Sequence, residues 1–313
     1  MGVGHYLGLD LGGTKVAVGV VDQEGRVRAR AQALTAELRE GGDPLAKIIQ
    51  LARGVLSPGS ELRGVGVALP GPTDRETLRL LAAPTIPEIE GVPLAPALER
   101  AFGCSAAGDN DANGAALAES RFGAGAGFRQ VVYFTISTGI GGGIVLDGRV
   151  LRGSHGTSAE LGHQVILPIG GPSCDCGGQG CLEALASGRG IVRRARTVLA
   201  AHGQPLPPEP IDTLWVAEQA RIGAAWAGEV WQETALYLGV GISNVINILD
   251  PDVVVLGGGV ATGAQDLLLP AVRDVVRTRC MPSLRRDVPI LPAALGSEVG
   301  IVGAACLAME AGL

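Results

Sequence analysis

The sequence predicts an α/β fold with two domains, on the basis of three observations. Strand-like and helix-like segments alternate along the chain, which is the pattern of α/β proteins. The chain has 313 residues, 47% of them hydrophobic, which is enough for two hydrophobic cores. A strand, a glycine-rich turn and a second strand occur in LGLDLGGTKVAVGVVDQEGRV and again in QVVYFTISTGIGGGIVLDGRV. This repeat predicts a duplicated architecture with a cleft between the halves.

The first half is predicted to begin with a β-meander over residues 5–13, 14–22 and 26–35, with a turn at Gly12-Gly13. Apolar residues at helical spacing predict a helix over residues 43–56, with Asp43 as its cap and Pro44 in its first turn. The segments that follow alternate strand, helix, strand and helix, at residues 62–70, 93–103, 104–110 and 111–123.

The second half is predicted to begin with strands at residues 130–138 and 144–150 around a glycine turn at 139–143. Apolar periodicity then predicts helices at residues 187–202, 213–222, 224–248, 264–279 and 298–312. Buried strands are predicted at residues 252–260 and 288–295. These elements predict domains of residues 1–112 and 113–297, with the helix at about 298–313 packing back on the first domain.

The composition excludes several classes of protein. The net charge is −6 and the pI is near 5.3, whereas a protein that depends on phosphate-backbone contacts is normally basic. Asn247, Asp250 and Asp252 break the longest apolar runs, which are too short to cross a bilayer. The first residues carry no secretory signal pattern. We therefore expect a cytoplasmic protein with neither a nucleic acid nor a membrane as partner.

A cluster of cysteines with one histidine is the most informative local pattern. The ligand set is His163, Cys174, Cys176 and Cys181, within HQVILPIGGPSCDCGGQGCLE. Three thiolates and an imidazole suit a closed, tetrahedral, structural zinc site. The alternative is a group of buried thiols, which the spacing disfavours. Because Glu160 and Glu183 flank the cluster, we expect the metal to hold a polar pocket in place.

Glycine turns follow three of the predicted strands, at Gly12-Gly13, at residues 139–143 and at residues 257–259. Glycine lets backbone N–H groups approach an anion closely, and Thr14 and Thr138 lie beside two of these turns. Together they favour a nucleoside triphosphate as ligand. Neither a P-loop nor a dinucleotide-binding glycine motif is present.

Two aspartates allow more than one interpretation from the residues alone. Asp10, beside a glycine turn, indicates Mg²⁺, or else a strand-end aspartate with local hydrogen bonds. Lys15 either neutralises phosphate or is a solvated strand lysine. Asp111 follows Asn110 immediately before a helix, where it is either a general base or an ordinary N-cap. The arginines of residues 189–196 are expected to form a solvated helix face, with a binding patch as the alternative.

These segments together resemble the ROK family of sugar kinases, which has the actin-like, hexokinase-type ATPase fold, a ribonuclease H-like α/β architecture. The match covers nearly the whole chain, and the cysteine knuckle and the long motif before it are its most specific parts. The matching segments are LGLDLGGTKVAVGVVD, GVGVALPGPTD, GDNDANGAALAE, ISTGIGGGIVLDGRVLRGSHGTSAELGH, CDCGGQGCLE and NILDPDVVVLGGGV. The resemblance implies ATP-dependent phosphorylation of a hexose, glucose to glucose 6-phosphate first among them.

The resemblance also implies roles for individual residues. Asp111 would be the general base for the sugar 6-hydroxyl, and His163 would bind the sugar and structural zinc through different ring nitrogens. The other sugar-binding residues would be Gly71, Asn110, Glu160 and Glu183. The residues around ATP and Mg²⁺ would be Asp10, Gly12, Gly13, Thr14, Lys15, Thr138, Gly139, Gly257, Gly258 and Gly259.

Sugar identity and assembly stay open at this point. Ala83-Pro84-Thr85 and Ala159 depart from the usual glucokinase pattern, which has asparagine in place of Thr85 and glycine in place of Ala159. Fructose, mannose or an N-acetylhexosamine are alternative acceptors. The alternative of another class is a sugar-responsive regulator of the ROK type that lacks a DNA-binding domain. We expect a homodimer or homotetramer.

Overall fold

The computed structural model describes residues 4–38, 40–81, 85–207, 210–282 and 288–313. The chain forms two compact units, each with its own sheet. The first comprises residues 1–127, 145–158 and 294–313, and the second comprises residues 128–144 and 159–293. The first boundary thus falls after residue 127, later than the expected position at 112, because helix α4 (Asp111–Phe122) packs on helix α11 (Val299–Glu310) of the first unit.

The sheet of the first unit has the strand order β3-β2-β1-β4-β7. The strands β1, β2 and β3 form the predicted antiparallel meander, and β4 and β7 add to it in parallel. Their bounds are β1 (His5–Leu11), β2 (Lys15–Val21), β3 (Val27–Leu34), β4 (Leu62–Leu69) and β7 (Ala106–Asn110).

The two faces of this sheet bury different helices, as strand alternation requires. Leu7, Leu9 and Leu11 of β1 lie in one core with α2 (Pro44–Arg53) and α3 (Leu94–Phe102). Tyr6, on the other face, packs with Ile301 of α11. The short elements of this unit that the sequence did not predict include α1 (Thr35–Leu38), the hairpin β5 (Thr73–Asp74) and β6 (Arg79–Leu80), and η1 (Pro87–Ile89).

The second sheet has the strand order β10-β9-β8-β11-β12. The strands are β8 (Gln130–Ile136), β9 (Ile140–Leu146), β10 (Arg149–Val150), β11 (Val253–Gly257) and β12 (Ile290–Pro292). As in the first sheet, the first three strands of the unit lie side by side in the reverse of their chain order. Strand β10 pairs antiparallel with β9, and β11 and β12 then join in parallel beside β8. The predicted duplication is therefore confirmed by an identical strand order.

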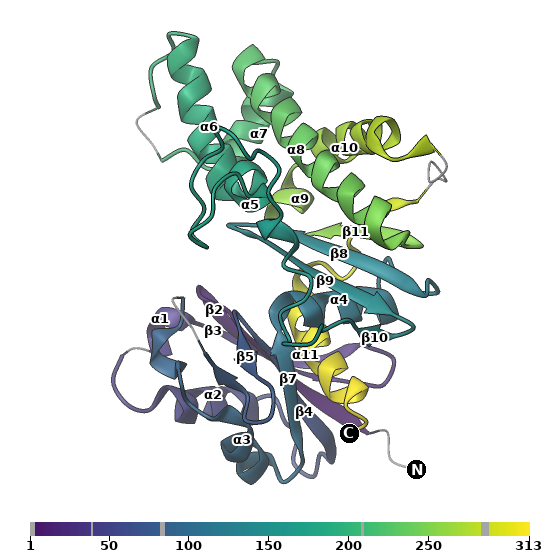
Figure 1. Ribbon diagram of the computed structural model, residues 1–313. Coiled ribbons are helices and arrows are strands. Elements are labelled where there is room, and N and C mark those ends of the chain that lie inside the picture. Colours follow the sequence, from purple (N-terminus) through teal and green to yellow (C-terminus); the bar gives the residue numbers. More distant parts are fainter. Residues whose placement is uncertain (1–3, 39, 82–84, 208–209, 283–287) are drawn as a thin grey trace. The chain divides into compact units, whose positions relative to one another are not determined.

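Helices lie together over one face of the second sheet, as Figure 1 shows for α6, α7, α8 and α10. The helices of this unit are α5 (Leu182–Ala186), α6 (Gly188–Ala201), α7 (Thr213–Arg221), α8 (Ala225–Leu249), α9 (Gly259–Gly263) and α10 (Gln265–Arg279). Single turns of 3₁₀ helix occur at η2 (Leu161–His163) and, in the first unit, at η4 (Gly296–Glu298). Within the described ranges, no helix combines the length and apolarity needed to span a membrane.

The glycine turn predicted at residues 139–143 is shorter in the structure. Strand β9 already starts at Ile140, so only residues 137–139 form the turn. Gly142 lies within this strand, and a Cβ there would be 2.5 Å from the side chain of Leu161, so glycine permits the close approach. The predicted strand at residues 252–260 likewise ends at Gly257, and residues 259–263 form a short helix instead.

Candidate functional site

The four predicted zinc ligands lie together in the second unit. Their ligand atoms are all within 4.8 Å of one another. The Sγ of Cys174 is 3.7 Å from Nδ1 of His163, and the Sγ of Cys176 is 3.8 Å from that of Cys181. A tetrahedral zinc ion with ordinary bond lengths would place such atoms about 3.5–3.8 Å apart. The four side chains therefore fit the ion.

Local backbone structure brings these ligands together. Gly177 N–H donates to Cys174 O at 3.0 Å, and Cys174 N–H donates to Gly178 O at 2.9 Å, which closes a tight knuckle. Cys181 is the last residue before α5, and His163 ends the turn η2. Burial, with the two neighbouring thiols, raises the pKa of Cys181 to about 12. A bound cation would reverse this effect, because a coordinating thiol is deprotonated.

The second ring nitrogen of His163 faces away from the sulfur atoms. Its Nε2 is 3.9 Å from a carboxylate oxygen of Glu160, whose side chain is 59% exposed. Ala159, which precedes Glu160, has φ of +66°, a left-handed conformation that favours glycine. The family preference for glycine at this position thus has a backbone cause.

Glu183 lies in the first turn of α5 with its side chain largely buried. Its carboxylate accepts the N–H of Ile140 at 2.9 Å, and Arg189 donates to it at 3.3 Å. It therefore contacts the turn between β8 and β9 from the side of the cysteine cluster. A second set of bonds holds the same turn, because the N–H groups of Gly188 and Arg189 donate to the carbonyls of Ser137 and Thr138.

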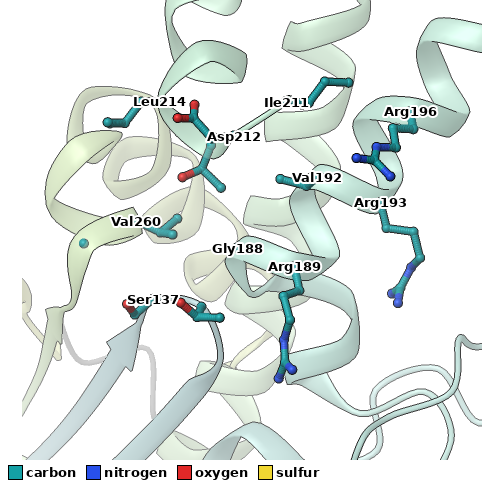
Figure 2. Close-up of a pocket in the computed structure, with 13 residues that line it drawn as sticks. Ser137, Gly188, Arg189, Val192, Arg193, Arg196, Ile211, Asp212, Leu214 and Val260 are labelled. Carbon is teal, nitrogen blue, oxygen red and sulfur yellow. The ribbon is translucent and has the colours of Figure 1, made fainter. Parts of the chain in front are cut away.

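A pocket of about 590 Å³ opens beside this turn, entirely within the second unit. Figure 2 shows Ser137 at its base, the side chain of Val192 on α6 opposite Val260 on α9, and Ile211 with Leu214 farther along. Apolar side chains on two walls and polar groups near a backbone turn are typical of a small-molecule site. Of the predicted nucleotide residues, Thr138 and Gly259 line this pocket. Gly257 does not, since it is buried against Tyr133.

The arginines of α6 divide between two environments. Arg189, Arg193 and Arg196 lie at helical spacing on one side and border the pocket. Arg194 is mostly buried instead, where it pairs with Glu233 at 2.8 Å. The expectation of a solvated face therefore holds for Arg189, Arg193 and Arg196, which are exposed, and is wrong for Arg194. No sequence motif marks Ile211 or Leu214, which reach the pocket only through the fold.

In the first unit, residues 12–14 form the turn between β1 and β2. Gly12 N–H donates to Lys15 O at 3.0 Å, and Gly13, Thr14 and Lys15 are exposed. The buried Thr35, which the sequence analysis missed, donates from Oγ1 to Gly12 O at 2.6 Å. Its N–H also donates to Thr14 O at 2.9 Å. The two hydrogen bonds from Thr35 thus hold the turn in place, while Gly13 and Thr14 are exposed to solvent.

Asp10 lies one strand position before the end of β1, against the start of α11. A Cβ on Gly300 would lie 2.0 Å from its Oδ2, so glycine is required for this close approach. Burial raises the pKa of Asp10, and the positive charge of Lys15 offsets part of that rise. A carboxylate in this position is well suited to accept a cation.

Asn110 and Asp111 occupy the start of α4 with different roles. Asn110 is the N-cap, and its Oδ1 accepts the N–H of Ala112 at 2.9 Å. Asp111 is the first helical residue, is exposed, and accepts the same N–H at 2.8 Å. The capping role is therefore filled by Asn110. Gly71 lies just beyond β4, where its N–H donates to Leu69 O at 3.1 Å.

The structure places the predicted residues in two groups. Asp10, the turn at residues 12–15, Gly71, Asn110 and Asp111 belong to the first unit. Thr138, Gly139, the glutamates 160 and 183, the cysteine cluster and residues 257–259 belong to the second. Thr85 lies against the turn at residues 12–15, because a Cβ on Gly13 would be only 2.6 Å from the Cβ of Thr85. Ala83 and Pro84 lie outside the described residues.

The chain is similar to known proteins along nearly its whole length. The ROK family model matches residues 6–311. A glucokinase of Streptomyces coelicolor is 34% identical over 319 residues, covering 98% of each chain. A ROK hexokinase structure from Thermus thermophilus is 38% identical with a TM-score of 0.82, covering 98% of this chain and 99% of that chain. A ROK family glucokinase from Streptomyces griseus, in complex with glucose and AMPPNP, is 35% identical with a TM-score of 0.81, covering 98% and 100%.

Proposed function

The chain belongs to the ROK family and is a hexose kinase, and we propose that it transfers the γ-phosphoryl group of ATP to the 6-hydroxyl of glucose. The proposal that ATP binds in the second unit is supported by the pocket between the turn that follows β8 and the turn that follows β11. Its apolar walls at Val192, Ile211 and Val260 suit a base, and Thr138 with its neighbouring backbone suits phosphate.

We propose Asp111 as the general base. It is exposed at the first position of α4, so a substrate can reach its carboxylate, one oxygen of which also accepts the N–H of Ala112. The sugar oxygen would form a bond to the γ-phosphorus while the bond to the β,γ-bridging oxygen breaks, and the hydroxyl proton would pass to Asp111. Catalysis of this kind depends mainly on positioning and on neutralising charge.

The remaining predicted polar residues would bind and orient the substrates. Asn110, Glu160 and the free nitrogen of His163 offer donors and acceptors that suit a neutral polyol, whose hydroxyls do both. One carboxylate oxygen of Glu183 already accepts the N–H of Ile140, next to the turn at residues 137–139. A sugar hydroxyl would therefore bind the same carboxylate that holds this turn. The turn at residues 12–15 offers backbone N–H groups and Lys15 to phosphate.

Two metal ions fit the residues present. His163, Cys174, Cys176 and Cys181 would hold structural zinc, which stabilises the loop that carries Glu160 and Glu183. Asp10 would hold Mg²⁺ through water, because its carboxylate lies beside an exposed glycine turn and a cation there would offset the cost of burying its charge. When bound, Mg²⁺ neutralises phosphate charge during transfer. Association into a homodimer or homotetramer stays a prediction that light scattering would test.

The test is ADP release with Mg²⁺ and ATP against glucose, mannose, fructose, N-acetylglucosamine and N-acetylmannosamine. We expect the highest kcat/KM with glucose. A higher value for another hexose would preserve the kinase and change its acceptor. Hexose binding by calorimetry without turnover of any sugar, in folded protein loaded with zinc, would instead favour a sugar-responsive regulator.

A further inference from the structure

Asp109 is a buried carboxylate directly before the Asn110-Asp111 pair. It lies near the end of β7 and is only 3% exposed. Its Oδ1 accepts the N–H of Asn110 at 2.7 Å and the Nδ2–H of Asn113 at 3.1 Å. One oxygen atom therefore holds both the residue before Asp111 and the residue two after it.

The other oxygen of Asp109 is bound by arginine. Arg152 donates from Nε to Oδ2 at 2.6 Å, and Arg75 has its Nε 3.6 Å from the same atom. Arg152 follows β10, so the contact joins residues 43 positions apart within the first unit.

Arg152 is held in turn by Glu310 near the end of α11. The guanidinium forms an ion pair with Glu310 through NH2 and donates to its Oε1 through NH1 at 3.2 Å. The N–H of Val150 also donates to Glu310, at 2.8 Å. The side chains of Arg152 and Glu310 are 18% and 9% exposed, so solvent screens the pair weakly.

The charges of this network are well matched. Burial opposes the charge on Arg152, but the hydrogen bonds that it donates to Glu310 and Asp109 outweigh burial and raise the pKa of the arginine. Burial likewise opposes the charge on Glu310, while the hydrogen bonds from Arg152 and Val150 N–H lower its pKa overall. Both groups are therefore ionised near neutral pH, and the arginine keeps one orientation between two carboxylates.

A general base must lie within hydrogen-bond reach of the proton it removes, and an error of about 1 Å can cost about 100-fold in rate. Asp111 has a short side chain, so its position follows the backbone of the first turn of α4. That backbone is held by Asp109. We propose that Asp109 is a positioning residue for Asp111, and that Arg152 and Glu310 hold Asp109 in place. This inference rests on the proposed role of Asp111 as general base.

The test compares Asp109→Asn, Arg152→Lys and Glu310→Gln with Asp22→Asn as a matched control. Asp22 is also a fully buried carboxylate in the first unit, and it is bound by Arg26 and Arg28. It has no hydrogen bond to α4 in the described chain. Asp109→Asn replaces an acceptor with an amide that faces Arg152, whereas the lysine and glutamine variants keep approximate size and leave Asp109 itself unchanged.

For Asp109→Asn we expect kcat with glucose and ATP to fall about 10- to 100-fold, while KM for both substrates changes less than about threefold. Arg152→Lys and Glu310→Gln should lower kcat by about three- to tenfold, in folded protein. Asp22→Asn should lower the melting temperature and leave kcat within about twofold. If Asp109→Asn fails to fold, the two milder variants decide the question through the same separation of kcat from KM.

The outcomes separate this inference from the proposed function. If all three variants have a lower melting temperature but an unchanged kcat, as we expect for Asp22→Asn, the network is only structural and the inference is overturned. If Asp111→Asn is inactive in the same assay, the proposed base survives that result. If Asp111→Asn retains turnover, Asp111 is not the base and the positioning role of Asp109 is overturned with it.

Discussion

The carboxylate of Glu183 accepts the backbone N–H of Ile140 at 2.9 Å. This bond joins the helix that follows the cysteine cluster to the turn that borders the pocket proposed for the nucleotide. Cys181 is the residue before that helix, and Glu183 lies two residues farther on. A change at Cys181 is therefore expected to disturb this turn through Glu183.

Asp111→Asn should abolish phosphorylation while the protein still binds glucose. The amide cannot accept the hydroxyl proton, and loss of a general base typically costs about 10²- to 10⁴-fold in kcat. Coupled ADP assays measure the rate, and calorimetry measures glucose affinity. Asp43→Asn is the matched control, because Asp43 is an aspartate at the start of another helix, α2, and should show the activity of the unaltered enzyme. Turnover above a tenth of normal in Asp111→Asn would remove it from this role.

Cys181→Ser should lower bound zinc, melting temperature and activity together. Serine is a poor zinc ligand, and a structural zinc site contributes directly to folding. Metal content by mass spectrometry should be one zinc per chain in the unaltered protein. Cys280→Ser is the control, because Cys280 is buried but lies outside the cluster. A fully active, metal-free protein after chelation would contradict the zinc assignment.

Gly259→Leu should raise the KM for ATP about tenfold or more without changing glucose affinity. Gly259 lines the pocket, and a Cβ built on it meets nothing within 4 Å, so the protein tolerates the added side chain. The leucine would instead occupy space used by the nucleotide. Gly228→Leu on α8, which is equally open, is the control. Equal effects of the two variants on ATP KM would argue against a nucleotide in this pocket.

Ala159→Gly should stabilise the protein by about 1 kcal/mol. A left-handed conformation costs an alanine about 1–2 kcal/mol, and the greater freedom of glycine in the unfolded chain offsets part of the gain. Urea unfolding measures the difference. Ala271→Gly in the middle of α10 should destabilise by about 0.5–1 kcal/mol, since its backbone is helical. Loss of stability in both variants would mean that the positive φ at Ala159 carries no strain.

Asp22 should contribute stability that disappears in acid. Burial opposes its charge, but hydrogen bonds from Arg26 and Arg28 outweigh burial and lower its pKa from 3.8 to about 2. A depressed carboxyl pKa stabilises the fold above its ordinary value and loses this effect as pH falls toward 2. Asp22→Asn should therefore be less stable by about 1–3 kcal/mol at pH 7. The gap should narrow between pH 4 and pH 2, and a constant gap would contradict this.

Local patterns in the sequence predicted most of the longer elements and the side chains of the Cys/His cluster, because these depend on nearby residues. The glycine turn at residues 12–13 and the knuckle formed by residues 174–181 are such cases. Contacts between distant segments left no comparable pattern. Arg152 reaches Asp109 and Glu310 only after three separate segments have packed, and Ile211 reaches the pocket only through the fold. The environment of Arg194 was missed because its partner Glu233 lies on another helix.

The packing of α11 sets an order in which the chain can complete its structure. Ile301 and Ala305 of this helix cover the face of the first sheet that Tyr6 occupies, and Tyr6 donates a hydrogen bond to Leu313 O at 2.9 Å. On the ribosome, strands β1–β4 emerge early but keep that apolar face uncovered until residues 299–310 have been translated. The second unit, whose residues end at 293, leaves the ribosome sooner. The unit that is synthesised first is therefore the last to finish folding.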